Sequence, residues 1–418
     1  MSAAVQRPAR DRPPLVFVAA HIARHAPSEA GKSWNWARAL ARHYQLHLVA
    51  PTDAAQQCRD EPEAAGWSWH VTPRGQPLAL GLRYYGEYAQ WCRDATEVIR
   101  ELIPAVRPVL VHHITLGSFR VLPRYDRCGA PYTIGPLGGG ETTPRELLRT
   151  ARFPTSVLLA EFFRPWLNRA ATMVPSLRAV MRATQLALAT TPETETVLRR
   201  MGARRTGVAF PDCLAPDVDP TTARPAAERA AELPRRVRLI WAGRAVWWKA
   251  GQLALELLAR LRGVGIDAEL AMYCGGPAAD AWRNRAAALG LGDACRVHGL
   301  IPRPQLLAEL GRAHVFVFPT LHDSANAALL EAYAMGLPSL TVGLGGPAVI
   351  ATPETGFNVR PDNLDTWVGA AAARVRHWQQ EPAGWLAASE AAVRRARAFG
   401  PAHIEAIVDR WLMPEVRA

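Results

Sequence analysis

Residues 314–338 read HVFVFPTLHDSANAALLEAYAMGLP, and this stretch has the pattern of a strand, a loop and a helix in succession. An apolar run comes first, then a polar break, then apolar residues at helical spacing that end at Gly336 and Pro338. Asp323 therefore lies in the loop and Glu331 on the helix. The first turn of such a helix offers unpaired N–H groups and a positive dipole end, which favour an anionic ligand.

A second strand, loop and helix pattern surrounds residues 243–251, which read GRAVWWKAG. Gly243 permits a sharp turn after the apolar strand expected at 237–242. Arg244 and Lys249 then place two cations on one loop, in front of the next helix. Two fixed cations on one loop favour the binding of a diphosphate.

Taken together, these stretches resemble the donor-binding motifs of retaining glycosyltransferases of the GT-B fold, glycosyltransferase family 4. The resemblance implies that Arg244 and Lys249 stabilise the leaving nucleoside diphosphate. It also implies that Asp323 orients the sugar hydroxyls and that Glu331 holds the ribose. The family usually has Glu where this chain has Asp323, and residues 324–326 replace its aromatic–glycine pair, so the sugar stays open. From the residues alone, a helix cap at Asp323 and a surface role for Glu331 are the alternatives.

The same resemblance implies further contacts with the donor. A turn at Gly275 brings the backbone near the nucleotide, with a plain αβ turn as the alternative, and backbone groups around Ile301 hold the base. A glycine of the first β–α loop, here Gly31, faces the donor phosphates. The implied donor-binding residues are Gly31, Gly243, Arg244, Lys249, Gly275, Ile301, Asp323, Ser324, Ala325, Asn326, Ala327 and Glu331.

Candidate residues also occur in the first half of the chain. His112 and His113 end an expected strand, and the family places a histidine near the C6 hydroxyl of the transferred sugar. We assign that position to His113 and an acceptor contact to His112, although a histidine at a strand end is usually structural. Glu141 follows a glycine-rich loop and is assigned to the acceptor or the sugar. The implied catalytic residues are His113, Arg244, Lys249 and Asp323.

Alternating strand and helix patterns in both halves indicate an α/β protein with parallel sheets. The Pro-, Ala- and charge-rich residues 214–236 are expected to link the halves. With the resemblance, this predicts a GT-B fold of two Rossmann-like domains that face each other across a cleft. Residues 1–213 would bind the acceptor, 237–395 the nucleotide sugar, and a helix at 396–418 would return to the first domain. Residues 145–182 are expected to be helical, with breaks at their prolines.

Composition limits the partners and the location of the protein. The net charge of +12 fits an anionic substrate or an anionic membrane better than nucleic acid, because no nucleic-acid motif or dense basic tract occurs. The six scattered cysteines and the polar N-terminus predict a cytoplasmic protein without a metal site. The basic, aromatic residues 153–169 suggest peripheral contact with the inner face of the membrane, or else a helix pair that packs on the sheet.

We therefore expect a retaining glycosyltransferase that uses a nucleotide-diphosphate sugar, a front-face displacement and no cofactor or metal. The acceptor would be a saccharide, a lipid-linked molecule or a small molecule, in polysaccharide, lipopolysaccharide or other glycoconjugate synthesis. Alternatives are a soluble enzyme that tailors small molecules, a nucleotide-sugar epimerase or hydrolase, and a non-catalytic nucleotide-sugar binder. Residues 26–33 also resemble a P-loop without its first glycine, but no expected strand ends in the Asp that magnesium would require.

Overall fold

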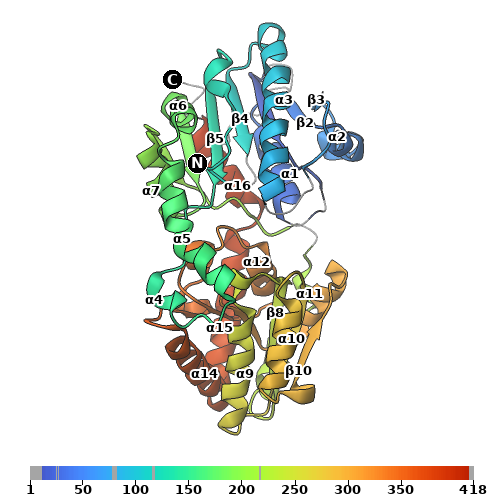
Figure 1. The fold of residues 1–418 in the computed structure, drawn as a ribbon. Coiled ribbons are helices and arrows are strands. Elements are labelled where there is room, and N and C mark those ends of the chain that lie inside the picture. Colours follow the sequence, from blue (N-terminus) through green and yellow to red (C-terminus); the bar gives the residue numbers. More distant parts are fainter. Residues whose placement is uncertain are drawn as a thin grey trace. The chain divides into compact units, whose positions relative to one another are not determined.

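The computed structural model describes residues 12–24, 26, 28–77, 82–114, 118–215 and 218–413. These residues form two compact units (Figure 1). The first unit draws on Met1–Gly140, Trp166–Ala215 and Pro401–Ala418, and the second on Glu141–Pro165 and Pro216–Gly400. The chain therefore passes from the first unit to the second and back twice. Among the described residues, no helix is both long enough and apolar enough to cross a membrane.

The described part of the first unit contains a seven-stranded parallel sheet in the order β3-β2-β1-β4-β5-β6-β7. Its strands are β1 (Pro14–Ala19), β2 (Gln45–Pro51), β3 (Ser68–Thr72), β4 (Leu110–Ile114), β5 (Tyr132–Leu137), β6 (Leu186–Ala189) and β7 (Thr206–Val208). Leu15 of β1 pairs with Leu46 on one side and with Leu110 on the other. A continuous apolar strand is typical of the middle of a parallel sheet, which is covered on both faces.

Helices cover both faces of this sheet. They are α1 (Ser28–Ala41), α2 (Thr52–Cys58), α3 (Leu82–Val106), α6 (Pro175–Ala183), α7 (Pro192–Met201), α16 (Pro401–Ile407) and the π-helical turn Val408–Leu412. Successive residues of β1 point to opposite faces. Phe17 packs in the cluster that contains Leu40 of α1 and Ile404 of α16, whereas Val16 packs with Trp91 of α3. The two sides of the sheet thus have separate cores.

The described part of the second unit contains a six-stranded parallel sheet in the order β10-β9-β8-β11-β12-β13. Its strands are β8 (Val237–Arg244), β9 (Ala268–Gly275), β10 (Cys295–His298), β11 (Val315–Phe318), β12 (Ser339–Thr341) and β13 (Gly356–Asn358). Its helices are α4 (Arg145–Leu148), α8 (Ala226–Glu232), α9 (Gly251–Gly263), α10 (Ala279–Ala288), α11 (Arg303–Arg312), α12 (Ala327–Ala334), α13 (Gly345–Ile350), α14 (Leu364–Gln380) and α15 (Pro382–Ala398).

The strand order of the second sheet reverses between β8 and β11. From β8 the chain moves outward through β9 and β10, and it then returns to β11 and continues outward on the other side. The loops that follow β8 and β11 therefore lead away in opposite directions. In open parallel sheets, such a reversal leaves a crevice at the carboxyl ends of the strands, where ligands bind.

The second unit also includes residues 141–165, which the sequence analysis assigned to the first domain. The physical reason is apolar packing, because Leu147 and Phe153 belong to the core of the second unit. The ring of Phe153 lies 6.0 Å from that of Trp247. The unit boundary falls inside helix α5 (Thr155–Ala171), which continues through Pro165 although the sequence predicts a break there.

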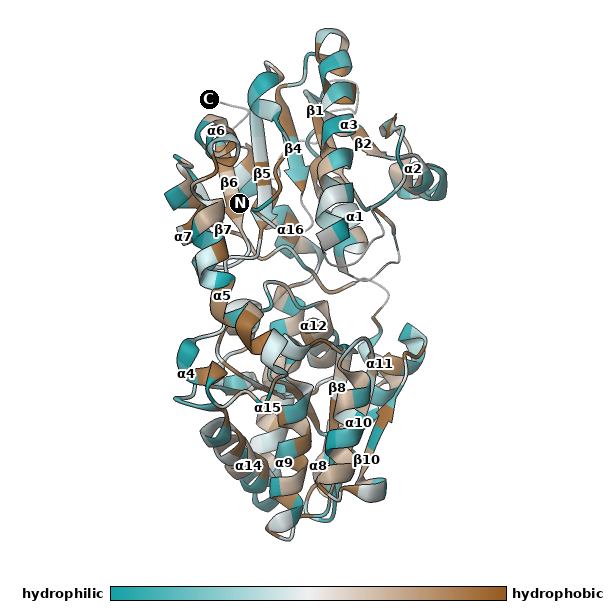
Figure 2. Cartoon of the chain, viewed as in Figure 1, coloured by the Kyte–Doolittle hydropathy of each residue, from teal (hydrophilic) through white to brown (hydrophobic). Residues whose placement is uncertain are grey.

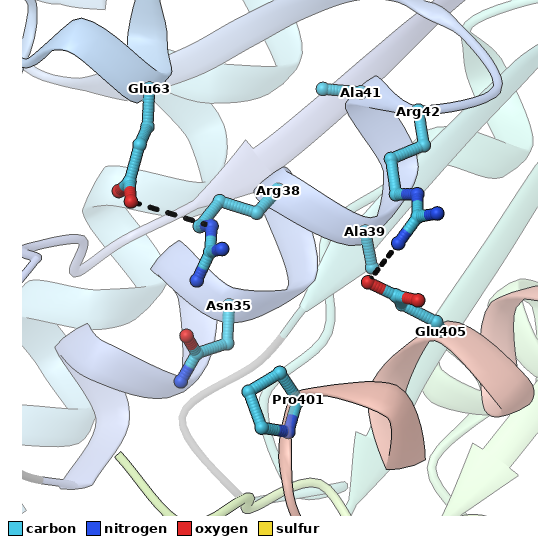
Figure 3. A pocket seen from close by; sticks show the side chains of 8 residues that line it. All are labelled: Asn35, Arg38, Ala39, Ala41, Arg42, Glu63, Pro401 and Glu405. Atoms are coloured by element: carbon cyan, nitrogen blue, oxygen red, sulfur yellow. Dashed lines mark ion pairs between the residues drawn. The ribbon is translucent and has the colours of Figure 1, made fainter. Parts of the chain in front are cut away.

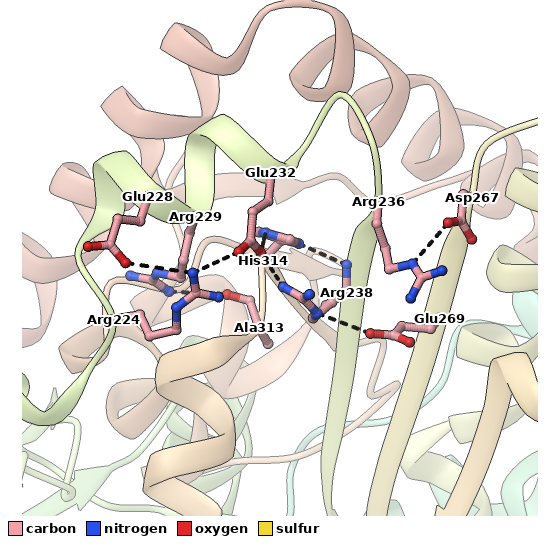
Figure 4. A network of polar contacts seen from close by, with 10 residues as sticks. All are labelled: Arg224, Glu228, Arg229, Glu232, Arg236, Arg238, Asp267, Glu269, Ala313 and His314. Carbon is pink, nitrogen blue, oxygen red and sulfur yellow. Dashed lines mark hydrogen bonds and ion pairs between the residues drawn. The ribbon is translucent and has the colours of Figure 1, made fainter.

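The expected linker at 214–236 contains helix α8, which an ionic network attaches to the second sheet (Figure 4). Glu232 of α8 accepts a hydrogen bond from Arg224 at 2.7 Å and another from Arg238 of β8. Arg238 also donates to Glu269 of β9 at 3.1 Å. These charged residues of the expected linker are therefore paired with one another and with the sheet.

Candidate active site

The loop that follows β8 presents the first predicted cation. Arg244 is the last residue of β8 and is exposed, and its guanidinium lies 6.0 Å from the ring centre of Trp248. Gly243 has a φ of +150°. A short turn over Trp247–Lys249 follows, and Ala250, with a φ of +48°, leads into α9. A non-glycine residue in the left-handed region is uncommon, so the surrounding packing fixes this turn.

Lys249 pairs with Asp323, the first acid of the loop that follows β11. The Nζ atom of Lys249 donates to Oδ2 of Asp323 at 2.6 Å, and the indole of Trp248 donates to Oδ1 at 3.3 Å. Burial raises the pKa of Asp323, but the charge and hydrogen bond of Lys249, together with His322 and Thr320, outweigh burial, and the pKa lies below its usual value. Asp323 is therefore a carboxylate held in a fixed direction at neutral pH.

Backbone bonds join the two loops. The carbonyl of Trp248 accepts from the amide of Leu321 at 2.8 Å and from the hydroxyl of Thr320 at 3.2 Å. The Trp248 ring also stacks on His322, with ring centres 5.2 Å apart. These backbone bonds and the ring stacking hold the two loops together, so the positions of Lys249 and Asp323 do not depend on their ion pair alone.

A glycine pair after β12 closes against the Asp323 loop. The amide of Gly346 donates to the carbonyl of Asp323 at 2.7 Å. A Cβ atom on Gly345, whose φ is +57°, would lie 2.4 Å from that same carbonyl and 3.4 Å from Cγ of Glu141. The structure thus places buried Glu141 beside this loop and leaves no space there for a larger residue than glycine at 345.

Helix α12 begins directly after the Asp323 loop. Ser324 and Ala325 are half-buried, whereas Asn326 is 4% exposed and precedes the first helical residue, Ala327. Neither side-chain amide atom of Asn326 has a hydrogen-bond partner within the described residues. An unsatisfied buried amide is costly, so a polar ligand or water at this helix start would stabilise it.

Glu331 lies one turn further along α12 and is already engaged. Its Oε1 atom accepts from Nε of Arg303 at 2.8 Å, and the side chains are 12% and 22% exposed. A ribose bound by Glu331 would therefore share this carboxylate with Arg303, a residue that the sequence analysis did not predict.

The predicted nucleotide turn follows β9. Gly275 ends that strand, and a Cβ atom there would lie 3.0 Å from Cγ of Leu300. Gly276 has a φ of +139° and approaches the carbonyl of Ala245, so the turns after β9 and β8 are in contact. Ile301 is half-buried beside the exposed Leu300. The donor-binding residues predicted in the second unit thus lie at the carboxyl ends of the strands, on the loops that follow them or, for Ala327 and Glu331, on helix α12.

Comparison with known proteins identifies this arrangement. The family described as Glycosyl transferases group 1 matches residues 236–377. A D-inositol 3-phosphate glycosyltransferase from Streptomyces avermitilis is 30% identical, over 90% of this chain and 92% of the relative. The chain belongs to the group 1 glycosyltransferases. The prediction of a transferase is therefore confirmed.

Solved structures place this glycosyltransferase in the GT-B fold. Sucrose-phosphate synthase from Thermosynechococcus elongatus has a TM-score of 0.65 at 15% identity, over 96% of this chain and 99% of that one. An Anabaena protein, HepE, in complex with UDP and glucose has a TM-score of 0.61 at 13% identity, over 96% and 100%. At such low identity the likeness concerns the fold alone. It confirms the predicted GT-B class with two Rossmann-like units.

The Asp323 loop also contacts residues that the sequence does not predict. Glu161 of α5, within the second unit, lies 3.1 Å from Nε2 of His322, and the hydroxyl of Thr143 donates to it at 3.3 Å. Burial raises the pKa of Glu161, but His322 and Arg164 outweigh burial and lower it to about 2. No local pattern marks this contact, because its partners are far apart in the sequence.

The structure buries His113, which the family resemblance places near the C6 hydroxyl of the transferred sugar, and that role stays a prediction. Its ring is fully buried, with Nε2 2.9 Å from the hydroxyl of Tyr88 and Nδ1 2.8 Å from that of Tyr125. His112 is also fully buried, with Nδ1 2.8 Å from the hydroxyl of Thr133. Burial lowers the pKa of each ring to about 3. The reason is that β4 lies between β1 and β5, where both faces of the sheet are covered.

Gly31 lies in the first turn of α1 rather than in a loop, because α1 begins at Ser28 instead of Ser33. A Cβ atom on Gly31 would lie 2.1 Å from the carbonyl oxygen of Ala26. The carbonyl of Ala26 therefore leaves no room for a side chain at position 31, which accounts for glycine there without any bound ligand. Its contact with donor phosphates stays a prediction.

A polar pocket of the first unit is lined by none of the predicted residues (Figure 3). Its lining residues are Asn35, Arg38, Ala39, Ala41, Arg42, Glu63, Pro401 and Glu405. Arg38 pairs with Glu63 at 3.9 Å and Arg42 with Glu405, so these arginines serve internal ion pairs. Within the described residues, no three His, Cys, Asp or Glu side chains gather as metal ligands.

Proposed function

We propose that this glycosyltransferase moves a sugar, with retention of its anomeric configuration, from a nucleoside-diphosphate sugar to an acceptor hydroxyl. One observation supports the proposal most directly: Lys249 and Asp323 meet on two bonded loops at the reversal of the strand order, and Arg244 ends the strand before the first of these loops. Parallel sheets bind ligands at this position. The Anabaena neighbour, whose structure contains UDP and glucose, supports a nucleotide-linked donor.

The cations would act on the leaving group. As the bond between sugar and phosphate breaks, negative charge develops on the departing diphosphate. Lys249 is held near that position by Asp323, and Arg244 projects from the end of β8 with an exposed guanidinium. Cations that are already oriented stabilise developing charge without the cost of reorganising during the reaction. They would therefore lower the barrier rather than only tighten donor binding.

The acids would position the two ends of the donor. Asp323 would accept hydrogen bonds from sugar hydroxyls, and Glu331 would accept them from the ribose beside Arg303. In the front-face displacement, the acceptor hydroxyl attacks on the side from which the diphosphate leaves. The departing phosphate oxygen takes its proton, so the step requires neither a protein base nor a metal ion.

The proposed setting is polysaccharide, lipopolysaccharide or other glycoconjugate synthesis on the cytoplasmic side of the membrane. The acceptor would be a saccharide, lipid-linked or small molecule. The similarity to a D-inositol 3-phosphate glycosyltransferase makes an inositol phosphate one acceptor to assay.

A donor screen and product analysis test this proposal. Thermal shift with UDP-, GDP-, ADP- and dTDP-sugars should show one nucleotide that stabilises the protein. Proton NMR of the product should then show the anomeric configuration of the donor. An inverted product would refute the retaining mechanism. Stabilisation by no sugar nucleotide would refute the donor class, and donor hydrolysis or epimerisation without transfer would show another reaction at this site.

A further inference from the structure

Helix α5 carries a row of exposed apolar side chains. They recur at spacings of one to four residues that keep them on one helical face, and those on the helix have exposed fractions between 41% and 61%. We call them the α5 surface, which comprises Leu159, Phe162, Phe163, Trp166 and Leu167, together with Met173 just beyond the helix. Hydrophobic colouring runs along part of this helix (Figure 2). Such a contiguous apolar face is unusual for a surface in contact with water.

The opposite face of α5 is buried, and two polar side chains lie on it in addition to Val157 and Leu158, which pack against the core of the second unit. Glu161 is 3% exposed and Asn168 is 5% exposed. The amide of Asn168 donates to the carbonyl of Gly139 at 3.2 Å, and Glu161 is bonded to His322. Buried polar side chains of this kind are unusual on the inner face of a helix that packs on a protein core. These buried bonds hold the apolar side outward, because rolling the helix would leave their polar atoms without partners.

Positive charge surrounds the α5 surface. Residues 145–178 contain six arginines and two glutamates. Arg152 pairs with Glu256 and Asp365, and Arg164 pairs with the buried Glu161. The guanidinium of Arg145 lies 4.8 Å from the ring centre of Phe162, and Arg169 is exposed on the helix itself. The whole chain carries a net charge of +12. An occupant of this surface should therefore be both apolar and anionic.

We propose that the α5 surface docks the protein on an anionic phospholipid bilayer. Aromatic rings and leucine side chains enter the boundary between headgroups and acyl chains, while arginines attract the anionic headgroups. A second copy of the chain fits this surface less well, because it would bring the same positive charge. The inference is independent of the proposed reaction, since binding to lipid requires neither donor nor acceptor.

Co-sedimentation of the full-length protein with vesicles tests the proposal. The protein should sediment with vesicles that mix phosphatidylcholine and phosphatidylglycerol, and much less with phosphatidylcholine alone. The double variant Phe163→Ser/Leu167→Ser should lower the apparent affinity about ten-fold or more. Arg169→Gln should lower it about five-fold. High salt should release the wild type, because it screens the attraction.

A matched control exchanges exposed valines elsewhere. Val71 is 47% exposed and Val264 is 43% exposed, and Val71→Ser/Val264→Ser should bind vesicles like the wild type. If Phe163→Ser/Leu167→Ser fails to fold by circular dichroism, Leu159→Ser/Phe162→Ser replaces it. Three outcomes would overturn the proposal: no vesicle binding by the wild type, unchanged binding by the folded α5 variants, or light scattering that shows a dimer which these variants dissociate.

Discussion

The ion pair between Lys249 and Asp323 fixes the direction of both charged groups. Both side chains are largely buried, so each charge depends on the other for its stabilisation. A diphosphate that enters beside Lys249 meets a cation whose direction is already set. The charged groups of such a site need to reorient little during the reaction, which is the condition for strong electrostatic catalysis.

Replacing Lys249 should therefore remove activity while the protein remains folded. We expect Lys249→Ala to lower kcat about 100-fold or more, because a preoriented charge on the leaving group is lost. The nucleotide-sugar transfer assay measures this effect. Arg312→Ala removes an exposed cation of the same unit and should retain the wild-type rate. A Lys249→Ala enzyme with wild-type kcat would show that the assigned role is wrong.

The buried pair His112 and His113 should make stability depend on pH. In the folded state the pKa of each is about 3, against 6.5 in the unfolded chain. Below pH 6.5 the two histidine rings bind protons in the unfolded chain but stay neutral in the folded protein. The free energy of unfolding therefore falls as the pH is lowered from 6.5 towards 3. At pH 5 the loss is up to about 2 kcal/mol for each ring.

Melting temperatures at pH 7.5 and pH 5 measure this dependence. The variant His112→Gln/His113→Gln should be less stable at pH 7.5 but should show a smaller fall between the two pH values. His377→Gln, at an exposed position, is the control and should keep the wild-type difference. If the double variant lost as much stability as the wild type between pH 7.5 and pH 5, other groups would dominate the pH dependence.

At this scale the sequence predicts some residues and misses others for a physical reason. Arg244, Lys249 and Asp323 each lie on one strand, loop and helix pattern, so local spacing is enough to place them after strand ends. The contact of Glu161 could not be predicted from the sequence, because it forms only when tertiary packing brings α5 to His322. The burial of His113 likewise depends on flanking strands, which the strand's own sequence does not reveal.

Among the elements, the glycine loop after β12 restricts the Asp323 loop most directly. Gly345→Ala would place a Cβ atom 2.4 Å from the Asp323 carbonyl, at a φ of +57° that side chains rarely adopt. We expect the loop to shift, donor KM to rise about ten-fold or more, and stability to fall by about 1–2 kcal/mol. Steady-state kinetics and thermal melts measure these changes.

The control for this loop is Gly369→Ala in α14, where no atom lies within 4 Å of the added Cβ. It should leave the kinetics unchanged and should not lower stability, because alanine favours a helix. Unchanged kinetics in Gly345→Ala would mean that the Asp323 loop moves freely and that its close contact is unimportant for donor binding.

Element boundaries could be predicted only where local chemistry decides them. The apolar strands β8 and β11 follow from their composition, because fully buried parallel strands require it. Pro165 predicts a break, yet α5 continues, since buried contacts on both sides of the proline hold the helix. Helix α8 is missed because its stabilisation comes from tertiary contacts, namely the ion pair of Glu232 with Arg238 of the sheet and the burial of Ala230 in the core.

For the molecule as a whole, the C-terminal segment is a structural part of the first unit. Ile404, Val408 and Leu412 are buried in its core, and the ring of Trp411 packs against Gly207. Deleting residues 401–418 should therefore destabilise the first unit and leave the second folded. Calorimetry should then show two unfolding transitions. The transition of the first unit should move to a lower temperature, and that of the second unit should stay nearly unchanged. A donor nucleotide should still raise the midpoint temperature of the second-unit transition.

If the truncated chain cannot be obtained, Ile404→Ala and Leu412→Ala provide the same test in the full-length protein. Each should cost about 2–5 kcal/mol through a cavity in the first core. Val359→Ala, at a half-exposed position in the second unit, is the control. If every variant showed only one unfolding transition, with a changed midpoint temperature, the two units would unfold together.

The repeated passage of the chain between units has a mechanical consequence. Residues 12–24 and 401–413 both belong to the first unit, and the second is inserted between segments of the first. A pulling force applied to the two ends would thus load the first unit and bypass the second until the first comes apart. In an optical trap, the second unit, which carries Lys249 and Asp323, would be the last to extend.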